Sequence, residues 1–193
     1  MTDTLNRPSR PEATAIPMHR DRYQPAVIFM HWLTLLLLIA VYAFIELKGY
    51  FPKKSPARDA MQGWHELMGI TVFGIVLARL LVRRLYDRTP AIAPEPPHWQ
   101  LAMAKAMHVT LYAFLVIMPI LGWFVVSAKG TLDLPLGVHL MPLVAPDKPL
   151  AETLQEIHET IGNVGYYLVG LHALVALFHH YWMRDNTLRR MLP

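Results

Sequence analysis

The chain has 193 residues, of which 54% are hydrophobic and only 17% are charged, a composition that fits a membrane protein better than a soluble domain. It contains no cysteine, which excludes disulfides, thiolate-held iron–sulfur clusters and the attachment of c-type haem. The formal charge is +4, but the basic residues flank apolar stretches and form no nucleic-acid-reading motif, so no nucleic-acid partner is expected. A bound metal would therefore depend on histidine, carboxylate or methionine.

The first residues of the chain differ in composition from the rest. Residues 1–20 are mostly polar, contain three prolines and show no helical or strand periodicity, which predicts a flexible cytoplasmic tail. They do not resemble a signal peptide, because the apolar run that follows is too long for one. The remainder, residues 21–193, is predicted to be one four-helix transmembrane domain.

Four segments are apolar over the roughly 20 residues that a helix needs to cross the hydrocarbon core. They lie at 26–47, 62–86, 101–127 and 153–183. Glycines, a proline and histidines interrupt the last three, which is typical of helices that bury polar groups against one another. The sequence therefore predicts an all-α fold, an integral membrane four-helix bundle in contact with membrane lipid.

The lysines and arginines predict the orientation of the bundle. Twelve of the eighteen fall in the tail, around the loop between the second and third spans, and at the C-terminal end. Because basic residues concentrate on the cytoplasmic side, we expect a multi-pass protein of the bacterial inner membrane with both termini cytoplasmic.

Four histidines fall at matched depths when the spans alternate in direction. His65 and His158 lie near the outer starts of their spans, and His31 and His172 lie nearer the cytoplasm. His158 and His172 are 14 residues apart, about 21 Å along one helix and about 40° short of four turns. One helix can thus supply a ligand to each of two haems stacked across the membrane. Two histidines on one iron leave it no open position, which favours electron transfer over oxygen binding.

Depth alone does not select the two histidines of the inner pair. His108, His179 and His180 also lie toward the cytoplasm, although His179 would be about 31 Å along the helix from His158, which favours His172. A single intramembrane histidine often forms only a hydrogen bond between helices, whereas four at two matched levels favour haem.

A short motif surrounds each outer histidine. The strings His65-Glu66-Leu67-Met68-Gly69 and His158-Glu159-Thr160-Ile161-Gly162 share the pattern H-E-x-x-G, in which the glycine lies on the histidine's face. The missing side chains could leave room for a macrocycle or allow close helix packing. The pattern lacks the second histidine of the zinc-protease motif H-E-x-x-H.

Arg79 is 14 residues from His65 and shares roughly its face. It could bind a haem propionate near the inner pair or extend to the cytoplasmic headgroups, and the sequence leaves both open.

At this point the sequence resembles the bacterial di-haem cytochrome b561 family, and especially its small stand-alone superoxide oxidases. The strings that carry the resemblance are His31-Trp32, Gly49-Tyr50-Phe51-Pro52, His65, His158-Glu159-Thr160, Gly170-Leu171-His172-Ala173, His179-His180-Tyr181 and Asp185-Asn186-Thr187-Leu188. The resemblance implies two haem b groups with His31, His65, His158 and His172 as ligands. It also implies an oxidoreductase that transfers electrons from periplasmic superoxide to ubiquinone.

An alternative function is a cytochrome b subunit that relays electrons between quinone and a periplasmic dehydrogenase or hydrogenase partner. The substrate sites are predicted only in outline. Lys48, Lys53, Lys54 and Arg58 in the first outer loop could attract a small anion or be ordinary loop charges. His179, His180 and Arg184 could contact a quinone or anchor the helix at the interface.

Overall fold

The computed structural model describes residues 22–85 and 89–193; the tail predicted for residues 1–20 lies outside the described residues. The chain forms four long helices, α1 (Pro25–Leu47), α2 (Pro56–Leu85), α3 (His98–Lys129) and α4 (Lys148–Phe178). Short helical turns lie at Lys48–Tyr50, Pro135–Gly137 and Arg189–Met191, and a π-helical turn, His179–Met183, extends α4. In these ranges there is no strand, only an isolated bridge between Asp133 and His139, so the all-α prediction is confirmed.

All four helices begin before their predicted spans, and two of them do so by more than one helical turn. α2 starts six residues and α4 five residues before the predicted spans. Proline occupies the first turn of both helices, where its missing N–H costs nothing. The Asp147 side chain also caps α4 by accepting a hydrogen bond from the backbone N–H of Leu150 at 3.0 Å. Hydropathy detects only the membrane-embedded part, so these capped polar turns were missed.

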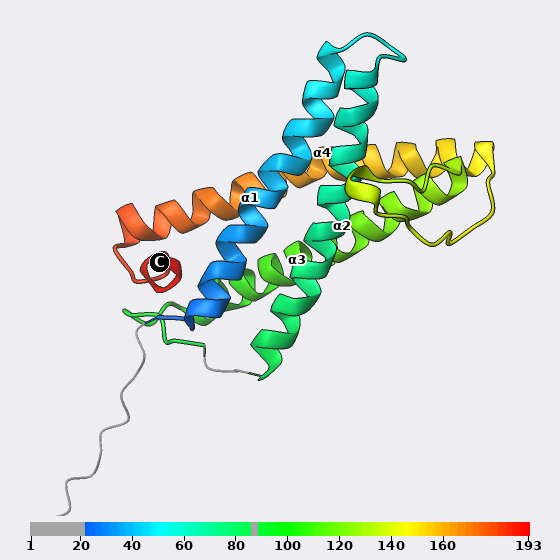
Figure 1. Ribbon diagram of the computed structural model, residues 1–193. Helices are drawn as coiled ribbons and strands as arrows, with labels where there is room; N and C mark the ends of the chain where they lie inside the picture. Colours follow the sequence, from blue (N-terminus) through cyan, green and yellow to red (C-terminus); the bar gives the residue numbers. More distant parts are fainter. Residues whose placement is uncertain (1–21, 86–88) are drawn as a thin grey trace, which may run out of the picture.

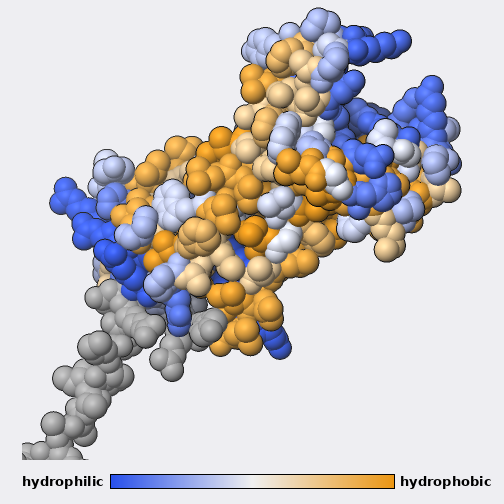
Figure 2. Space-filling view, in the orientation of Figure 1, coloured by the Kyte–Doolittle hydropathy of each residue, from blue (hydrophilic) through white to orange (hydrophobic). Residues whose placement is uncertain are grey.

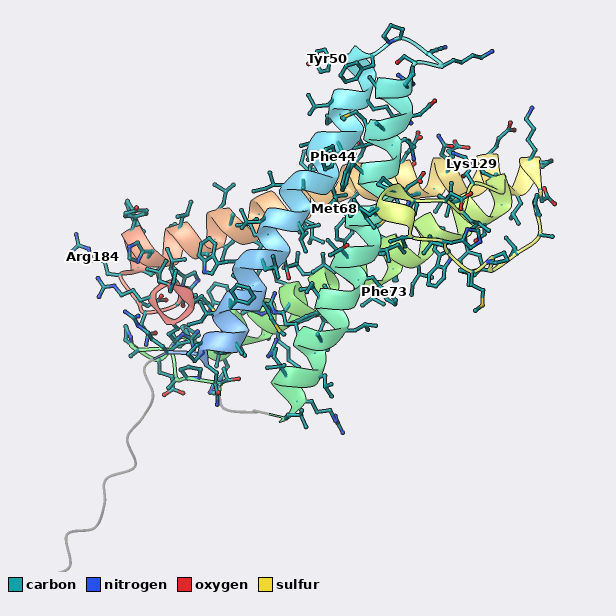
Figure 3. All side chains as sticks on the ribbon, viewed as in Figure 1. Phe44, Tyr50, Met68, Phe73, Lys129 and Arg184 are labelled. Carbon is teal, nitrogen blue, oxygen red and sulfur yellow. The ribbon has the colours of Figure 1, made fainter. Side chains whose placement is uncertain are left out.

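The helices form two hairpins, α1–α2 and α3–α4, which cross one another in Figure 1. We call the end of each hairpin that carries its loop, residues 48–55 or 130–147, the outer end, and the opposite end the inner end. Figure 3 labels Lys129 and Arg184 at opposite ends of the α3–α4 hairpin. The second loop packs back on the helices, because Leu134 and Leu140 are buried against Leu67 and Val126.

The surface agrees with a membrane location. All four helices are long and apolar enough to cross a membrane. Figure 2 shows apolar side chains over the middle of the molecule, with hydrophilic residues gathered toward its ends. Large apolar side chains such as Phe29, Ile117 and Leu174 are more than half exposed. Such a surface is suited to lipid rather than to water.

The hairpins approach closely at Gly165 of α4. A Cβ at this position would overlap both the Phe114 ring and the Tyr42 hydroxyl, so no larger residue fits without displacement. The Tyr42 hydroxyl also donates a hydrogen bond to the carbonyl of Gly162 at 2.8 Å. The small residues of α4 therefore let α1 and α3 pack against it, which fixes the level of one hairpin relative to the other.

Residues 184–193, which we call the C-terminal cap, close the inner end. His179 Nδ1 lies 2.5 Å from a carboxylate oxygen of Asp185, and both side chains are largely buried. Burial tends to raise the pKa of Asp185, but hydrogen bonds from His179 and Thr187 outweigh this and leave the pKa below its ordinary value. The Trp32 indole donates to the carbonyl of Met191 at 2.8 Å, which connects the C-terminal cap to α1.

We predict that Asp185→Asn destabilises the protein by about 1–3 kcal/mol, because the substitution removes a buried charge-assisted hydrogen bond. Because the folded-state pKa of Asp185 is lowered, its contribution is present above its unfolded pKa and is lost as the pH falls through the folded one. The difference from wild type should therefore narrow below about pH 4. Thermal unfolding of the purified protein at several pH values measures this.

The chain contains a matched control. Asp133 and His139 form the same kind of pair, 2.7 Å apart, but their side chains are 92% and 64% exposed. Asp133→Asn should leave the midpoint of unfolding almost unchanged, because exposed pairs contribute little. Equal effects of the two substitutions would contradict a stabilising role for the C-terminal cap.

Candidate functional site

The two outer histidines face one another across the hairpins. The ring centres of His65 on α2 and His158 on α4 are 6.2 Å apart, with planes at 82°. His65 Nδ1–H donates to the carbonyl oxygen of Val41 on α1 at 2.9 Å. That bond holds the proton on Nδ1 and leaves the Nε2 lone pair available to a metal.

The ring of His158 is held by packing. Within the described residues its Nδ1 is buried and has no hydrogen-bond partner. Gly122 of α3 lies directly against the ring, since a Cβ there would be 3.2 Å from His158 Cε1. The absence of a side chain at Gly122 therefore lets α3 pack beside this histidine.

A cavity of about 350 Å³ surrounds the outer pair, within the range of about 300–1,000 Å³ that is typical of cofactor and ligand pockets. All four helices line it, and Gly69 and Gly162 of the two H-E-x-x-G motifs are both in its wall. A Cβ at Gly69 would meet nothing within 4 Å, so this glycine leaves space. At Gly162 a Cβ would contact Met118 at 3.5 Å, so close helix packing explains the second glycine better.

A longer repeat around the outer histidines was not recognised from the sequence. A glutamine precedes each histidine by three residues, which extends both motifs to Q-x-x-H-E-x-x-G. Gln62 donates to Glu66 at 2.6 Å, and Gln155 donates to Glu159 at 2.6 Å. Both carboxylates are thus held in the same way on either side of the cavity.

The inner histidines also meet. The ring centres of His31 on α1 and His172 on α4 are 6.4 Å apart, with planes at 69°. Arg79 Nη2 donates to His31 Nδ1 at 3.1 Å, and the guanidinium lies 5.6 Å from the centre of the Tyr112 ring. Because Arg79 points into the bundle and its Nε is buried, the structure favours the interior role of this arginine over a contact with headgroups.

A third histidine lies at the inner level. The ring centre of His108 on α3 is 5.7 Å from that of His172. His179 is bound instead to Asp185, which removes it from the alternatives for the inner pair. Depth could not separate His108 from His31, because it gives the level of a residue in the membrane and not the direction in which it faces.

Both histidine pairs have the spacing that one shared metal requires. A metal–imidazole bond is about 2 Å long, so two rings on opposite sides of one metal have centres roughly 6 Å apart. The observed 6.2 and 6.4 Å agree with this value. The rings of each pair are therefore spaced so that one metal could lie between them.

The basic residues suggested for attracting an anion differ in their exposure and contacts. Lys53 and Lys54 are exposed in the first outer loop, whereas Arg58 donates to the carbonyls of Lys48 and Phe51 and so stabilises that turn. Lys48 lines the cavity of the outer pair.

At the inner end, His180 Nδ1 is buried without a partner in the described part of the chain, and Arg184 is exposed. Because His179 is paired with Asp185, His180 and Arg184 are the better candidates for a quinone contact.

Comparison with known proteins identifies the family. The family described as prokaryotic cytochrome b561 matches residues 22–193. The chain is 39% identical over 173 residues to cytochrome b561 homolog 1 of Escherichia coli (strain K12), covering 90% of this chain and 98% of that protein. It is 34% identical over 176 residues to a Yersinia pestis protein named probable superoxide oxidase CybB, covering 91% and 98%. Identity to cytochrome b561 homolog 2 of Escherichia coli (strain K12) is 26% over 177 residues, covering 89% and 92%.

The fold, the length of the match and these relatives all indicate the same family. The chain belongs to the prokaryotic cytochrome b561 family, bacterial membrane proteins that bind haem b and transfer electrons.

Proposed function

We propose that this protein is a di-haem cytochrome that transfers electrons from superoxide at the periplasmic face to ubiquinone in the membrane. The observation that carries the proposal is the pairing of four histidine rings at two levels, 6.2 Å apart in the outer pair and 6.4 Å apart in the inner pair. His65 and His158 are the ligands of the outer haem, and His31 and His172 are those of the inner haem.

The side chains around the ligands support these roles. His65 is already in the tautomer that presents Nε2, because its Nδ1–H is bound to Val41. His31 accepts a hydrogen bond from Arg79 on Nδ1, so its proton lies on Nε2 in this arrangement. Binding iron through Nε2 requires Arg79 to turn away from Nδ1, which frees the guanidinium for a carboxylate such as a haem propionate.

Haem b, when bound, supplies a one-electron redox centre, and two imidazole ligands leave its iron no open position for oxygen. The protein's part is to hold two such centres on one path. α4 connects them, because His158 and His172 are about 21 Å apart along its axis.

Two observations support superoxide as the electron donor. A relative that is 34% identical carries the name probable superoxide oxidase, and Lys53 and Lys54 form an exposed cationic loop at the outer end. Cationic residues raise the encounter rate of a small anion such as superoxide. Two superoxide anions each lose one electron to become dioxygen, and one ubiquinone takes up both electrons and two protons to become ubiquinol.

Quinone binding is placed at the inner end of α4, near His180 and Arg184. We place both termini in the cytoplasm, because basic residues concentrate at the inner end. The inner histidine pair, which would hold one haem, is then nearer the proposed quinone site, and the outer pair, which would hold the other, is nearer the periplasm.

The ligand assignment predicts which histidines are needed for each haem. His172→Ala should reduce the haem-to-protein ratio from two to one, because the two irons lie at separate levels. His31→Ala should also lose one haem, while His108→Ala should retain both. Pyridine haemochrome assay and optical redox titration measure this. If His108→Ala loses a haem and His31→Ala does not, His108 is the inner ligand.

The cavity predicts an effect of filling the space at Gly69. Gly69→Leu should strongly reduce occupancy of the outer haem, because its side chain enters the space beside His65 that the cofactor needs. Gly74→Leu on the same helix is the control, because a Cβ there also meets nothing within 4 Å but Gly74 is not in the cavity wall. Equal haem content in the two variants would argue against this cavity as the haem site.

The activity itself is tested with the purified protein. Superoxide should drive reduction of a soluble ubiquinone by this protein without a partner dehydrogenase or hydrogenase. Lys53→Gln combined with Lys54→Gln should lower this rate several-fold at low salt and weaken its salt dependence, since long-range attraction is screened by ions. Quinone reduction that requires a co-purifying dehydrogenase or hydrogenase would instead support the alternative, a cytochrome b subunit that serves a partner.

A further inference from the structure

Two lysines from opposite hairpins converge on the outer end of the cavity. We propose that Lys48 and Lys129, both in the wall of the cavity around His65 and His158, bind the two propionates of the outer haem and so turn its propionate edge toward the outer surface. This inference rests on the proposed function, since it requires a haem between these two histidines.

The two lysines have equivalent positions relative to the histidines. Val41 of α1 accepts the hydrogen bond from His65, and Lys48 follows it by seven residues. Gly122 of α3 contacts the ring of His158, and Lys129 follows it by seven residues. Seven residues are about two helical turns and about 10.5 Å of rise, so each lysine lies on the same face as the contact and nearer the outer end.

The ammonium groups of both lysines lie near carboxylates but do not form salt bridges with them in the described residues. Lys48 donates instead to the side-chain carbonyl of Gln62. The three glutamates of the cavity wall accept hydrogen bonds from neutral groups: Glu46 from Tyr166 at 2.7 Å, Glu66 from Gln62 at 2.6 Å and Glu159 from Gln155 at 2.6 Å.

The opposite wall of the cavity could not receive a propionate. Toward the inner end it is lined by Leu38, Val72, Phe114 and Leu115, which offer no hydrogen-bond donor on their side chains. A carboxylate turned in that direction would be buried without a partner, which is strongly unfavourable. The apolar inner wall and the two lysines of the outer wall therefore favour one orientation of the haem, with its propionates toward Lys48 and Lys129.

The test compares Lys48→Gln and Lys129→Gln with Lys148→Gln. Lys148 begins α4 near the same outer end, but its side chain is 87% exposed and it is not in the cavity wall. Each variant is first shown to carry two haems per chain. The rate of haem loss to an excess of a haem-scavenging apoprotein is then measured, together with both midpoint potentials and the propionate bending bands in the resonance Raman spectrum.

We expect Lys48→Gln and Lys129→Gln each to accelerate loss of one haem about tenfold, as expected for removal of one charge-assisted hydrogen bond. They should also lower the midpoint potential of that haem, because a cation stabilises the reduced, more negative form, and shift its propionate bands. Lys148→Gln should change none of these, and Lys129→Arg should restore wild-type behaviour. Repeating the titration in the His172→Ala background, which should retain only the outer haem, identifies the affected one.

The inference is wrong if both cavity variants match Lys148→Gln in haem loss, potential and Raman bands while wild type holds two haems. It is also wrong if they alter only the salt dependence of superoxide oxidation, because the lysines then serve an incoming anion. A wild-type protein without a haem at His65 and His158 would instead refute the proposed function.

Discussion

The structure depends on the burial of polar rings in an apolar bundle. A histidine nitrogen that is buried between membrane helices without a partner is unfavourable, because no water is available to replace the partner. At His65 one nitrogen is bound to the carbonyl of Val41, and the other faces the cavity shared with His158. The chain thus supplies a partner for one nitrogen of His65 and leaves the other nitrogen to a ligand. Such half-satisfied rings are the form in which imidazole binds metals.

Rigid spacing of the rings follows from the way in which the hairpins cross. The absence of a side chain lets Gly122 lie against the His158 ring and lets Gly165 lie against Phe114 and Tyr42. The Tyr42 hydroxyl also donates a hydrogen bond to the carbonyl of Gly162. At the inner end the C-terminal cap holds Trp32, the neighbour of His31 in the chain. Contacts at both ends of α1 therefore fix its level against α4, which keeps both histidine pairs at a similar separation.

Much of this arrangement could be predicted from the sequence. Apolar length gave the four helices, and depth placed His65 opposite His158 and His31 near His172, as the ring contacts show. Depth could not reveal that His108 faces His172 too, because facing direction depends on helix packing. The convergence of Lys129 with Lys48 could not be predicted either, since it depends on how two distant hairpins cross. The glutamines of the longer motif were visible in the sequence and were overlooked.

The distribution of charge bears on the direction of electron flow. Three glutamates and two lysines line the cavity of the outer pair, whereas Arg79 lies against His31 and Arg83 binds the hydroxyl of Tyr112 nearby. Cations favour the reduced state of a haem and carboxylates favour the oxidised state, and both effects are stronger away from water. On the proposed ligand assignment, we therefore expect the inner centre to be the better electron acceptor of the two. Electrons entering from the outer end would move inward, toward the end proposed for quinone, and the order of the two midpoint potentials in an optical redox titration decides whether they do.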